Sequence, residues 1–175
     1  MTADLTLFDE VPEGYRKNAG VVLVAGDGRV FAGQRADMSA PAWQMPQGGI
    51  DDDEPVLTAA LRELEEETGV PAARVEPLAL TPQWLTYDLP AELAARMWHG
   101  RYRGQAQRWV ALRFHGSDDD IDLDQPHPEF RAWRWMRPSE IEAAIVDFKR
   151  PAYRYVFACF RDFLAEIGRA SCRER

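Results

Sequence analysis

Three glutamates near the middle of the chain have the spacing of neighbours on one face of a helix. Glu63, Glu66 and Glu67 stand at positions i, i+3 and i+4, which places their carboxylates side by side. Without a cation, each pair of like charges destabilises the helix by roughly a few tenths of a kcal/mol. A hard divalent ion such as Mg²⁺ reverses this effect, because it prefers carboxylate and water oxygens. The trio therefore predicts a divalent-metal site that faces an anionic substrate.

A solvated helix face is the competing interpretation, because glutamate-rich helices are common and the chain has 29 acidic residues. The wider stretch from Gly48 to Val70, GGIDDDEPVLTAALRELEEETGV, is far more specific. Glu54, Arg62 and Gly69 stand at fixed distances from Gly48 and from the three glutamates. Seven identities at such spacing arise by chance on the order of 10⁻⁸ times per starting position. The stretch resembles the Nudix box, the signature of the Nudix hydrolase superfamily.

This resemblance implies a metal-dependent hydrolase of nucleoside diphosphates linked to another moiety. The glutamates of such a box bind Mg²⁺ or Mn²⁺, and the resemblance implies that Arg62 and Glu54 orient the helix and its glutamates. Glu129 lies in a Pro-Glu-Phe segment that matches a further metal-site glutamate, although alone it indicates only a surface charge. The implied metal ligands are Gly48 through its backbone, Glu63, Glu66, Glu67 and Glu129. The same four glutamates are the catalytic residues that the resemblance implies, and Glu63 and Glu67 are the candidates that would position or deprotonate the attacking water.

The residues around the glutamates favour a loop, a helix and a second loop. Gly48-Gly49 lets the backbone approach a ligand closely, and Asp51 to Asp53 offer N-cap oxygens before Pro55 in the first turn. Gly69 suits the left-handed residue that ends many helices. Apolar residues at helical spacing predict a core-facing stripe made of Leu57, Ala60, Leu61 and Leu64. We therefore expect the glutamates to project from another side of the same helix.

Six segments outside the box extend the resemblance to one branch of the superfamily. In chain order they are GYRKNAG at 14–20, WQMPQGG at 43–49, WLTY at 84–87, QAQRW at 105–109, PEFRAWRW at 128–135 and FKR at 148–150. That branch contains bacterial RNA pyrophosphohydrolases and the dinucleoside polyphosphate hydrolases of bacteria and plants. The resemblance covers nearly the whole chain and implies the Nudix fold, an α/β/α sandwich with a mixed central sheet.

The substrate-binding residues that this resemblance implies are Arg16, Arg35, Tyr87, Gln105, Phe148 and Lys149. Members that act on RNA use two such arginines on the substrate and a Phe-Lys pair on a nucleobase. The chemistry is suitable, because an aromatic face stacks a base with roughly 1–3 kcal/mol and arginine forks fit polyphosphate oxygens. Burial in the core is an equal alternative for Phe148 and Tyr87, and a solvated surface charge is the alternative for each arginine.

The loop at 35–43 leaves the substrate open, because it is slightly longer than in RNA-acting members and closer to dinucleoside polyphosphate hydrolases. One candidate function is removal of pyrophosphate from the 5′-triphosphate end of RNA, which would promote mRNA decay. A second is hydrolysis of a dinucleoside polyphosphate such as diadenosine tetraphosphate. A third, a non-catalytic Nudix-fold sensor, disagrees with the intact box, since inactive sensors usually lose metal ligands. We expect the RNA reaction, with Mg²⁺ or Mn²⁺ as cofactor.

The composition fits one soluble domain, with 175 residues of which 46% are hydrophobic and 29% charged. The net charge of −8 argues against charge-driven binding to long duplex nucleic acid, but it permits binding of a short phosphate-bearing end. No apolar run approaches the ~20 residues that span a bilayer, and the N-terminus lacks signal-peptide features. Two cysteines form no disulfide framework. We therefore expect a cytoplasmic protein, monomeric by default and without an obligate protein partner.

Hydrophobic periodicity and turn residues predict strands at 18–25, 30–35, 75–80, 83–87, 105–114 and 130–136. Besides the box helix, helices are expected at 91–97, at 139–146 with Ser139 as the N-cap, and at 151–165. A single Nudix domain should span 1–165. The last ten residues, EIGRASCRER at 166–175, resemble the translation of a sequencing-library adapter, so we expect a non-native tail outside the fold.

Overall fold

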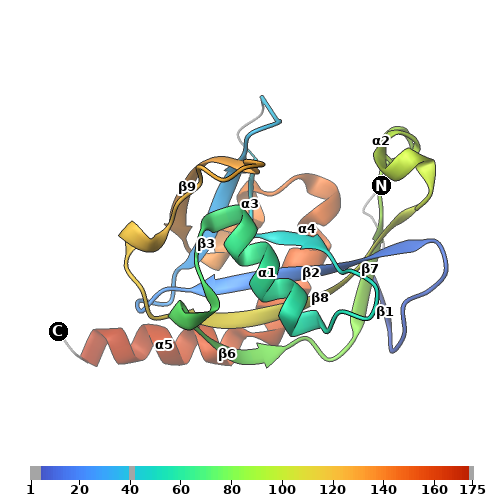
Figure 1. Cartoon of the computed structure of the whole chain (residues 1–175). Coiled ribbons are helices and arrows are strands. Elements are labelled where there is room, and N and C mark those ends of the chain that lie inside the picture. The colour runs from blue at the N-terminus through green and yellow to red at the C-terminus, as the bar shows by residue number, and fades with distance from the viewer. Residues whose placement is uncertain (1–4, 40–41, 174–175) are drawn as a thin grey trace.

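Two long strands, β2 (Tyr15–Val24) and β8 (Gly104–Phe114), form the centre of the sheet in the computed structural model, which describes residues 5–39 and 42–173. They run parallel, with Tyr15 beside Gly104 at one end and Val24 beside Arg113 at the other. The remaining strand pairings are antiparallel, so the sheet is mixed, as predicted (Figure 1).

Seven shorter strands complete the sheet. They are β1 (Thr6–Phe8), β3 (Val30–Arg35), β4 (Trp43–Gln44), β5 (Gln47–Gly49), β6 (Val75–Leu80), β7 (Trp84–Asp88) and β9 (Phe130–Met136). The main strand order is β1-β7-β8-β2-β3-β4, while β5 pairs with β2, β6 with β8 and β9 with β3. The bounds predicted for β3, β6 and β9 are confirmed, and β2, β7 and β8 differ from their predictions only at their ends.

Helices cover both faces of this sheet and make the expected α/β/α sandwich (Figure 1). Helix α1 (Val56–Thr68) lies on one face; α3 (Pro138–Ala144), α4 (Arg150–Cys159) and α5 (Arg161–Arg173) lie on the other. Helix α2 (Ala91–Arg96) continues into a short 3₁₀ segment, η2 (Met97–Gly100), beyond the end of β7. Within the described residues, no helix is long and apolar enough to cross a bilayer.

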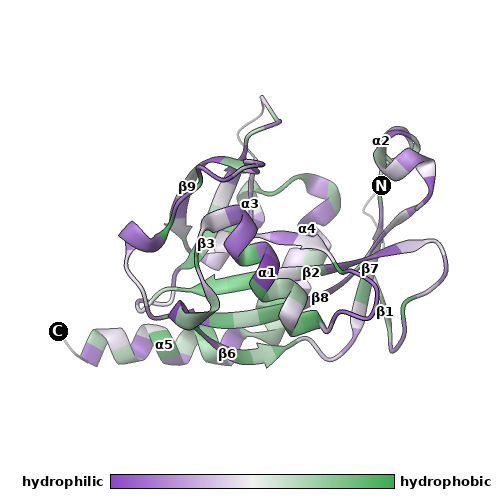
Figure 2. Ribbon diagram, viewed as in Figure 1, coloured by the Kyte–Doolittle hydropathy of each residue, from purple (hydrophilic) through white to green (hydrophobic). Residues whose placement is uncertain are grey.

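Side chains of β2 contribute to both hydrophobic layers, because successive strand residues point to opposite faces of the sheet. Val21 and Leu23 are buried against the α1 side, whereas Val22 and Val24 are buried against the α3–α4–α5 side. Figure 2 shows hydrophobic residues concentrated in β2 and β8, while α5 mixes hydrophobic and hydrophilic residues. This pattern is the physical basis of the sandwich, since a strand buried on both faces is apolar almost throughout.

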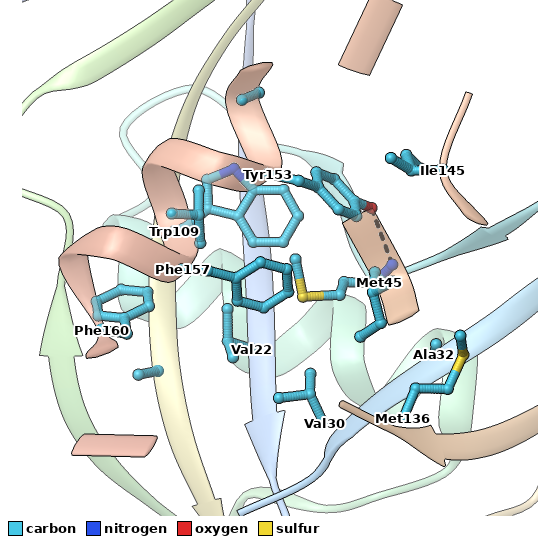
Figure 3. Packing of buried hydrophobic residues seen from close by; sticks show 14 of the residues in the cluster. Val22, Val30, Ala32, Met45, Trp109, Met136, Ile145, Tyr153, Phe157 and Phe160 are labelled. Atoms are coloured by element: carbon cyan, nitrogen blue, oxygen red, sulfur yellow. Dashed lines mark hydrogen bonds between the residues drawn. The ribbon is translucent and has the colours of Figure 1, made fainter. Parts of the chain in front are cut away.

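The second layer is packed around the indole of Trp109 on β8 (Figure 3). Its ring meets the ring of Tyr153 on α4 edge to face, with 5.5 Å between centroids. The Tyr153 hydroxyl in turn accepts a hydrogen bond of 2.9 Å from the backbone N–H of Met45. Gly20 on β2 has no side chain because a Cβ there would overlap the Trp109 indole. These contacts anchor α4 over the sheet next to the segment that leads into the glutamates.

Two local predictions for α1 are wrong. The N-cap is Pro55, which forms no side-chain cap, so the aspartates before it do not cap the helix. Leu57 was expected in the core stripe but is 38% exposed, because the buried face runs through Ala60 and Leu64 and continues to Glu67. The predicted left-handed end is confirmed, since Gly69 has φ 74° and its N–H bonds to the Glu65 carbonyl.

The C-terminal helices also differ from their predictions. Helix α3 begins at Pro138 with Arg137 as its N-cap, so Ser139 lies inside the helix. The single helix expected at 151–165 is divided at Phe160, whose ring is buried while its backbone leaves helical geometry. Helix α5 then continues to Arg173 and buries Ile167, so the described part of 166–175 packs on the fold instead of lying outside it. Whether that segment is native stays a prediction, and 174–175 lie outside the described residues.

Candidate active site

The three glutamates of α1 differ sharply in exposure, because the helix face that carries them turns from solvent toward the sheet. The side chain of Glu66 is 58% exposed and that of Glu63 is 13% exposed. Glu67 is buried, with 6% of its surface accessible. The exposure of the three side chains therefore falls in the order Glu66, Glu63, Glu67, so they do not form a uniformly solvated face.

Arg62 binds the carboxylates around it from the centre of this group. Its Nε and Nη2 donate to the two oxygens of Glu54 at 2.9 and 2.8 Å, and Nη1 donates to Glu63 at 2.9 Å. Nη1 also donates to Glu66 at 3.3 Å, and Nη2 donates to the Gly49 carbonyl at 2.9 Å. The hydrogen bond from Arg62 lowers the pKa of Glu54 below its usual range. This geometry supports the orienting role expected of the pair.

Glu67 is a buried carboxyl group whose surroundings stabilise a negative charge poorly. Its one hydrogen bond among the described residues comes from the Gln47 backbone N–H at 3.3 Å. Burial raises the pKa of Glu67 well above its usual value, and the nearby charges of Glu63 and Glu129 raise it further. Burial also raises the pKa of Glu63. A cation between these groups would remove the repulsion, so the donor set fits a hard divalent metal.

Backbone geometry brings the loop before α1 close to the same carboxylates. A Cβ built on Gly48 would overlap the Glu63 carboxyl group, so only glycine permits this approach. Among the residues that the structure describes, no three His, Cys, Asp or Glu side chains converge on one point.

A groove made of three adjoining cavities begins at these carboxylates. The first, about 440 Å³, is lined by Glu63, Glu66, Glu67, His127 and Glu129. The second, about 310 Å³, shares Glu63, Glu67 and Glu129 with the first and adds Arg16, Arg35, Gln44, Gly48 and Gln105. The third, about 470 Å³, shares Arg35 and Gln44 with the second and adds Phe148 and Lys149. The sequence-predicted residues, apart from three, thus line one continuous surface.

The exceptions are Glu54 and Arg62, which lie behind the glutamates, and Tyr87, which the structure places in the core. Tyr87 is 2% exposed and packs behind Phe148, with 6.1 Å between ring centroids. Its hydroxyl is buried without a hydrogen-bond partner among the described residues, and burial raises its pKa. The alternative of a buried tyrosine therefore agrees with this structure better than direct contact with substrate.

The two predicted arginines reach the groove in different states. Arg35 at the end of β3 forms a two-pronged ion pair with Asp37, which also lines the third cavity. Arg16 on β2 lies beside Gln105 in the parallel register with β8, which puts both on the groove floor. The loop that follows Arg35 is described only in part, because 40–41 lie outside the described residues.

Phe148 and Lys149 form the far end of the groove. Phe148 is half-buried and lines the cavity, so it is neither free in solvent nor a core residue. Lys149 is 7% exposed, and its Nζ lies 3.5 Å from Gln44 Oε1. Burial lowers the pKa of Lys149 to about 8, and the charge of Arg35 adds to this effect. A buried amine with one weak partner is suited to hold an acceptor from a ligand.

Sequence reasoning missed the buried amides under the groove. Gln107 Nε2 donates to Asn18 at 2.9 Å and to Gln47 at 2.5 Å, and Gln107 Oε1 accepts from Trp109 Nε1 at 3.0 Å. The signal was available, because Gln105 and Gln107 occupy inward-facing strand positions that continue as apolar residues from Trp109. Where side chains on one face change from amide to apolar, the groove floor becomes the core.

Comparison with known proteins agrees with this geometry. A family model described as the NUDIX domain matches residues 14–156. The chain is 59% identical over 150 residues to the RNA pyrophosphohydrolase of Dinoroseobacter shibae, which covers 86% of this chain and 94% of that protein. It is 55% identical over 151 residues to the RNA pyrophosphohydrolase of Cereibacter sphaeroides, and the match covers 86% of this chain and 93% of that protein.

Solved structures with a similar fold have much lower identity. The dihydroneopterin triphosphate pyrophosphohydrolase of E. coli matches with a TM-score of 0.65 and 22% identity, over 82% of this chain and 97% of that one. A binary complex of the C. elegans Ap4A hydrolase matches with a TM-score of 0.61 and 18% identity, over 85% of this chain and 98% of that one. At these identities the similarity concerns the fold alone.

Proposed function

The chain belongs to the NUDIX domain family, and from this premise we propose that it removes pyrophosphate from the 5′-triphosphate end of RNA, leaving a 5′-monophosphate. It is a Nudix pyrophosphohydrolase, an enzyme that acts on phosphoanhydride bonds. One observation carries the proposal: a single groove joins the carboxylates of α1 to the cavity that holds Phe148 and Lys149. Such a groove offers one end to a polyphosphate and the other to a nucleobase.

Nudix hydrolases use divalent metal ions, and we propose Mg²⁺ or Mn²⁺ for this one. The residues that would hold the ion are Glu63, Glu66, Glu67, Glu129 and the backbone of Gly48. Bound there, the ion neutralises phosphate oxygens and lowers the pKa of bound water. The poorly compensated charge on Glu67 supports this assignment, because a buried carboxylate otherwise weakens the fold.

The attacking water needs a proton acceptor, and we assign this role to the Glu129 carboxylate oxygen that would not be bound to the ion. Glu63 and Glu66 accept hydrogen bonds from Arg62, and Glu67 accepts one from Gln47. Glu129 has no side-chain hydrogen bond or ion pair within residues 5–39 and 42–173 while it faces Glu63 and Glu67 across the cavity. A carboxylate whose oxygens are free is the one that can take the proton.

The rest of the groove binds and orients the substrate. Arg16 supplies an N–H fork to phosphate oxygens, Arg35 supplies the N–H groups that its ion pair with Asp37 does not use, and Gln105 supplies a polar contact. Phe148 stacks on a base while Lys149 donates to an acceptor on its edge. The 5′-monophosphate product marks a transcript for decay, so we place the enzyme in bacterial mRNA turnover in the cytoplasm, with its catalytic domain within 1–165.

We expect Glu67→Gln to abolish turnover of triphosphorylated RNA and Glu129→Gln to lower kcat by roughly 10²- to 10⁴-fold, the usual contribution of a proton acceptor. The assay incubates a short 5′-triphosphate RNA with Mg²⁺ or Mn²⁺ and measures the 5′-monophosphate RNA and the released pyrophosphate or phosphate. Glu76→Gln is the matched control, because Glu76 is an exposed glutamate paired with His115 outside the groove. An intact 5′-triphosphate after incubation with wild-type protein would refute the function. Retained turnover by Glu67→Gln would refute the metal assignment.

A further inference from the structure

The guanidinium of Arg16 has two close neighbours. It lies over the indole of Trp98, with 5.0 Å from Cζ to the ring centroid. It also lies close to Gly49, where a Cβ would overlap the guanidinium group. A cation–π contact does not use the N–H donors of a guanidinium, so these stay available to a ligand.

Those free N–H groups face the groove. Arg16 and Trp98 line the same cavity as Glu63, Glu67 and Glu129. Within residues 5–39 and 42–173, Arg16 forms no hydrogen bond or ion pair, unlike Arg35, which is paired with Asp37. A clamped cation with unused donors next to a carboxylate cluster has the form of a site prepared for an anion.

Trp98 reaches this position through an unfavourable backbone. It has φ 49° and ψ 37°, and His99 follows with φ 58° and ψ 30°, before Gly100 at φ 69°. The left-handed region costs a bulky residue roughly 1–3 kcal/mol, and such strain persists where the surroundings impose it. Tyr102 packs edge-on against the indole at 6.0 Å, and the Trp98 carbonyl accepts from the Arg101 N–H at 3.2 Å. The strained turn therefore fixes the ring over Arg16.

We propose that Trp98 is a positioning residue that clamps Arg16 against Gly49 and directs its N–H fork at the polyphosphate of the substrate. This inference rests on the proposed function only for the identity of the substrate. Nothing in the box predicts Trp98, because η2 lies outside it and only the fold brings Trp98 to the lining of the same cavity. Trp98 acts through Arg16, so its contribution must disappear when Arg16 is absent.

A double-mutant cycle tests this dependence. Binding of inorganic tripolyphosphate to the full chain is measured by calorimetry at low ionic strength with EDTA present, and KM and kcat are measured on triphosphorylated RNA with Mg²⁺. Trp98→Ala should weaken tripolyphosphate binding and raise the KM by roughly 3- to 30-fold, the range of a cation–π contact, with kcat little changed. In the Arg16→Ala background the same substitution should have almost no effect. Trp98→Phe should restore most of the binding.

A comparison of Trp98→Gly with Trp98→Ala distinguishes the effect of losing the indole ring from the effect of the strained backbone. Trp98→Gly should unfold at a higher temperature than Trp98→Ala, because glycine adopts left-handed angles without strain, yet bind tripolyphosphate equally weakly. An equal loss of binding from Trp98→Ala with and without Arg16 would overturn the clamp, as would unchanged binding. If wild-type protein leaves RNA intact while the tripolyphosphate cycle shows the coupling, the proposed function fails and the clamp stands.

Discussion

Arg62 and Lys149 show how single residues divide the work at the two ends of the groove. Arg62 spends its hydrogen bonds on Glu54, Glu63 and Glu66, so it organises the carboxylates without reaching the substrate. Lys149 has one weak partner among residues 5–39 and 42–173, Gln44, and its pKa is lowered to about 8 by burial. The N–H donors of Arg62 are therefore all used within the protein, whereas Lys149 has N–H donors left for a ligand.

The lowered pKa of Lys149 predicts a pH dependence of substrate binding. Above pH 8 the amine loses its proton and its attraction to an acceptor, so the KM for triphosphorylated RNA should rise as the pH passes from 7 to 9. Lys149→Arg should make the KM nearly independent of pH in this range, because a guanidinium stays charged throughout. Lys149→Met should give a high KM at every pH. A wild-type KM that is constant over this range would contradict the role of Lys149.

The same group has a separate effect on stability. Between pH 8 and the usual lysine value of 10.5, the unfolded chain binds more protons than the folded one. The contribution of Lys149 to the free energy of unfolding should therefore increase with pH in that window. Binding and stability thus respond to pH in opposite directions, which distinguishes them.

Sequence alone could identify most residues of the groove but not their states. The fixed spacing of the box pointed to Glu63, Glu66 and Glu67, and the segments outside it pointed to Arg16 and Phe148. It could not show that Glu67 is buried while Glu66 is exposed, because that difference depends on how α1 tilts on the sheet. The choice between cleft and core for Tyr87 and the position of Trp98 could not be predicted for the same reason, since contacts between elements decide them.

Helix ends were the least predictable elements. Glycine at the end of α1 follows from local backbone geometry, and Gly69 was foreseeable. The starts of α1 and α3 were not, because Pro55 and Arg137 begin these helices without a side-chain cap. The division at Phe160 has no local sequence signal either, since neither proline nor glycine is present there and the buried ring redirects the chain.

Helix α5 should contribute to the stability of the fold through Ile167. Ile167 is 5% exposed and belongs to the hydrophobic layer around Trp109, although it lies in the segment expected to be a tail. Ile167→Ala should lower the free energy of unfolding by about 2 kcal/mol or more in a urea titration. Cys172→Ala, at an exposed position of the same helix, should change it by less than about 0.5 kcal/mol. Equal stability of Ile167→Ala and wild type would show that 166–173 do not support the fold.

The whole molecule uses the central pair of strands for two purposes. On one face of β8, Trp109 and Ala111 are apolar and belong to the core, whereas Gln105 and Gln107 before them form a hydrogen-bonded floor. In the parallel register the same change occurs on β2, from Asn18 to Val22. Glu63 and Glu67 of α1 and the strained turn at Trp98 line the same cavity as Gln105.

The assignment to RNA 5′ ends depends on which substrate matches both ends of the groove. The decisive measurement is kcat/KM for a short 5′-triphosphate RNA and for diadenosine tetraphosphate, at matched concentrations with Mg²⁺, in wild-type protein and in Phe148→Ala. We predict a higher value on RNA, and a fall in that value for Phe148→Ala through a roughly 5- to 100-fold rise in KM, as expected for a lost base stack. A far higher value on the dinucleotide in wild-type protein would contradict the assignment to RNA 5′ ends.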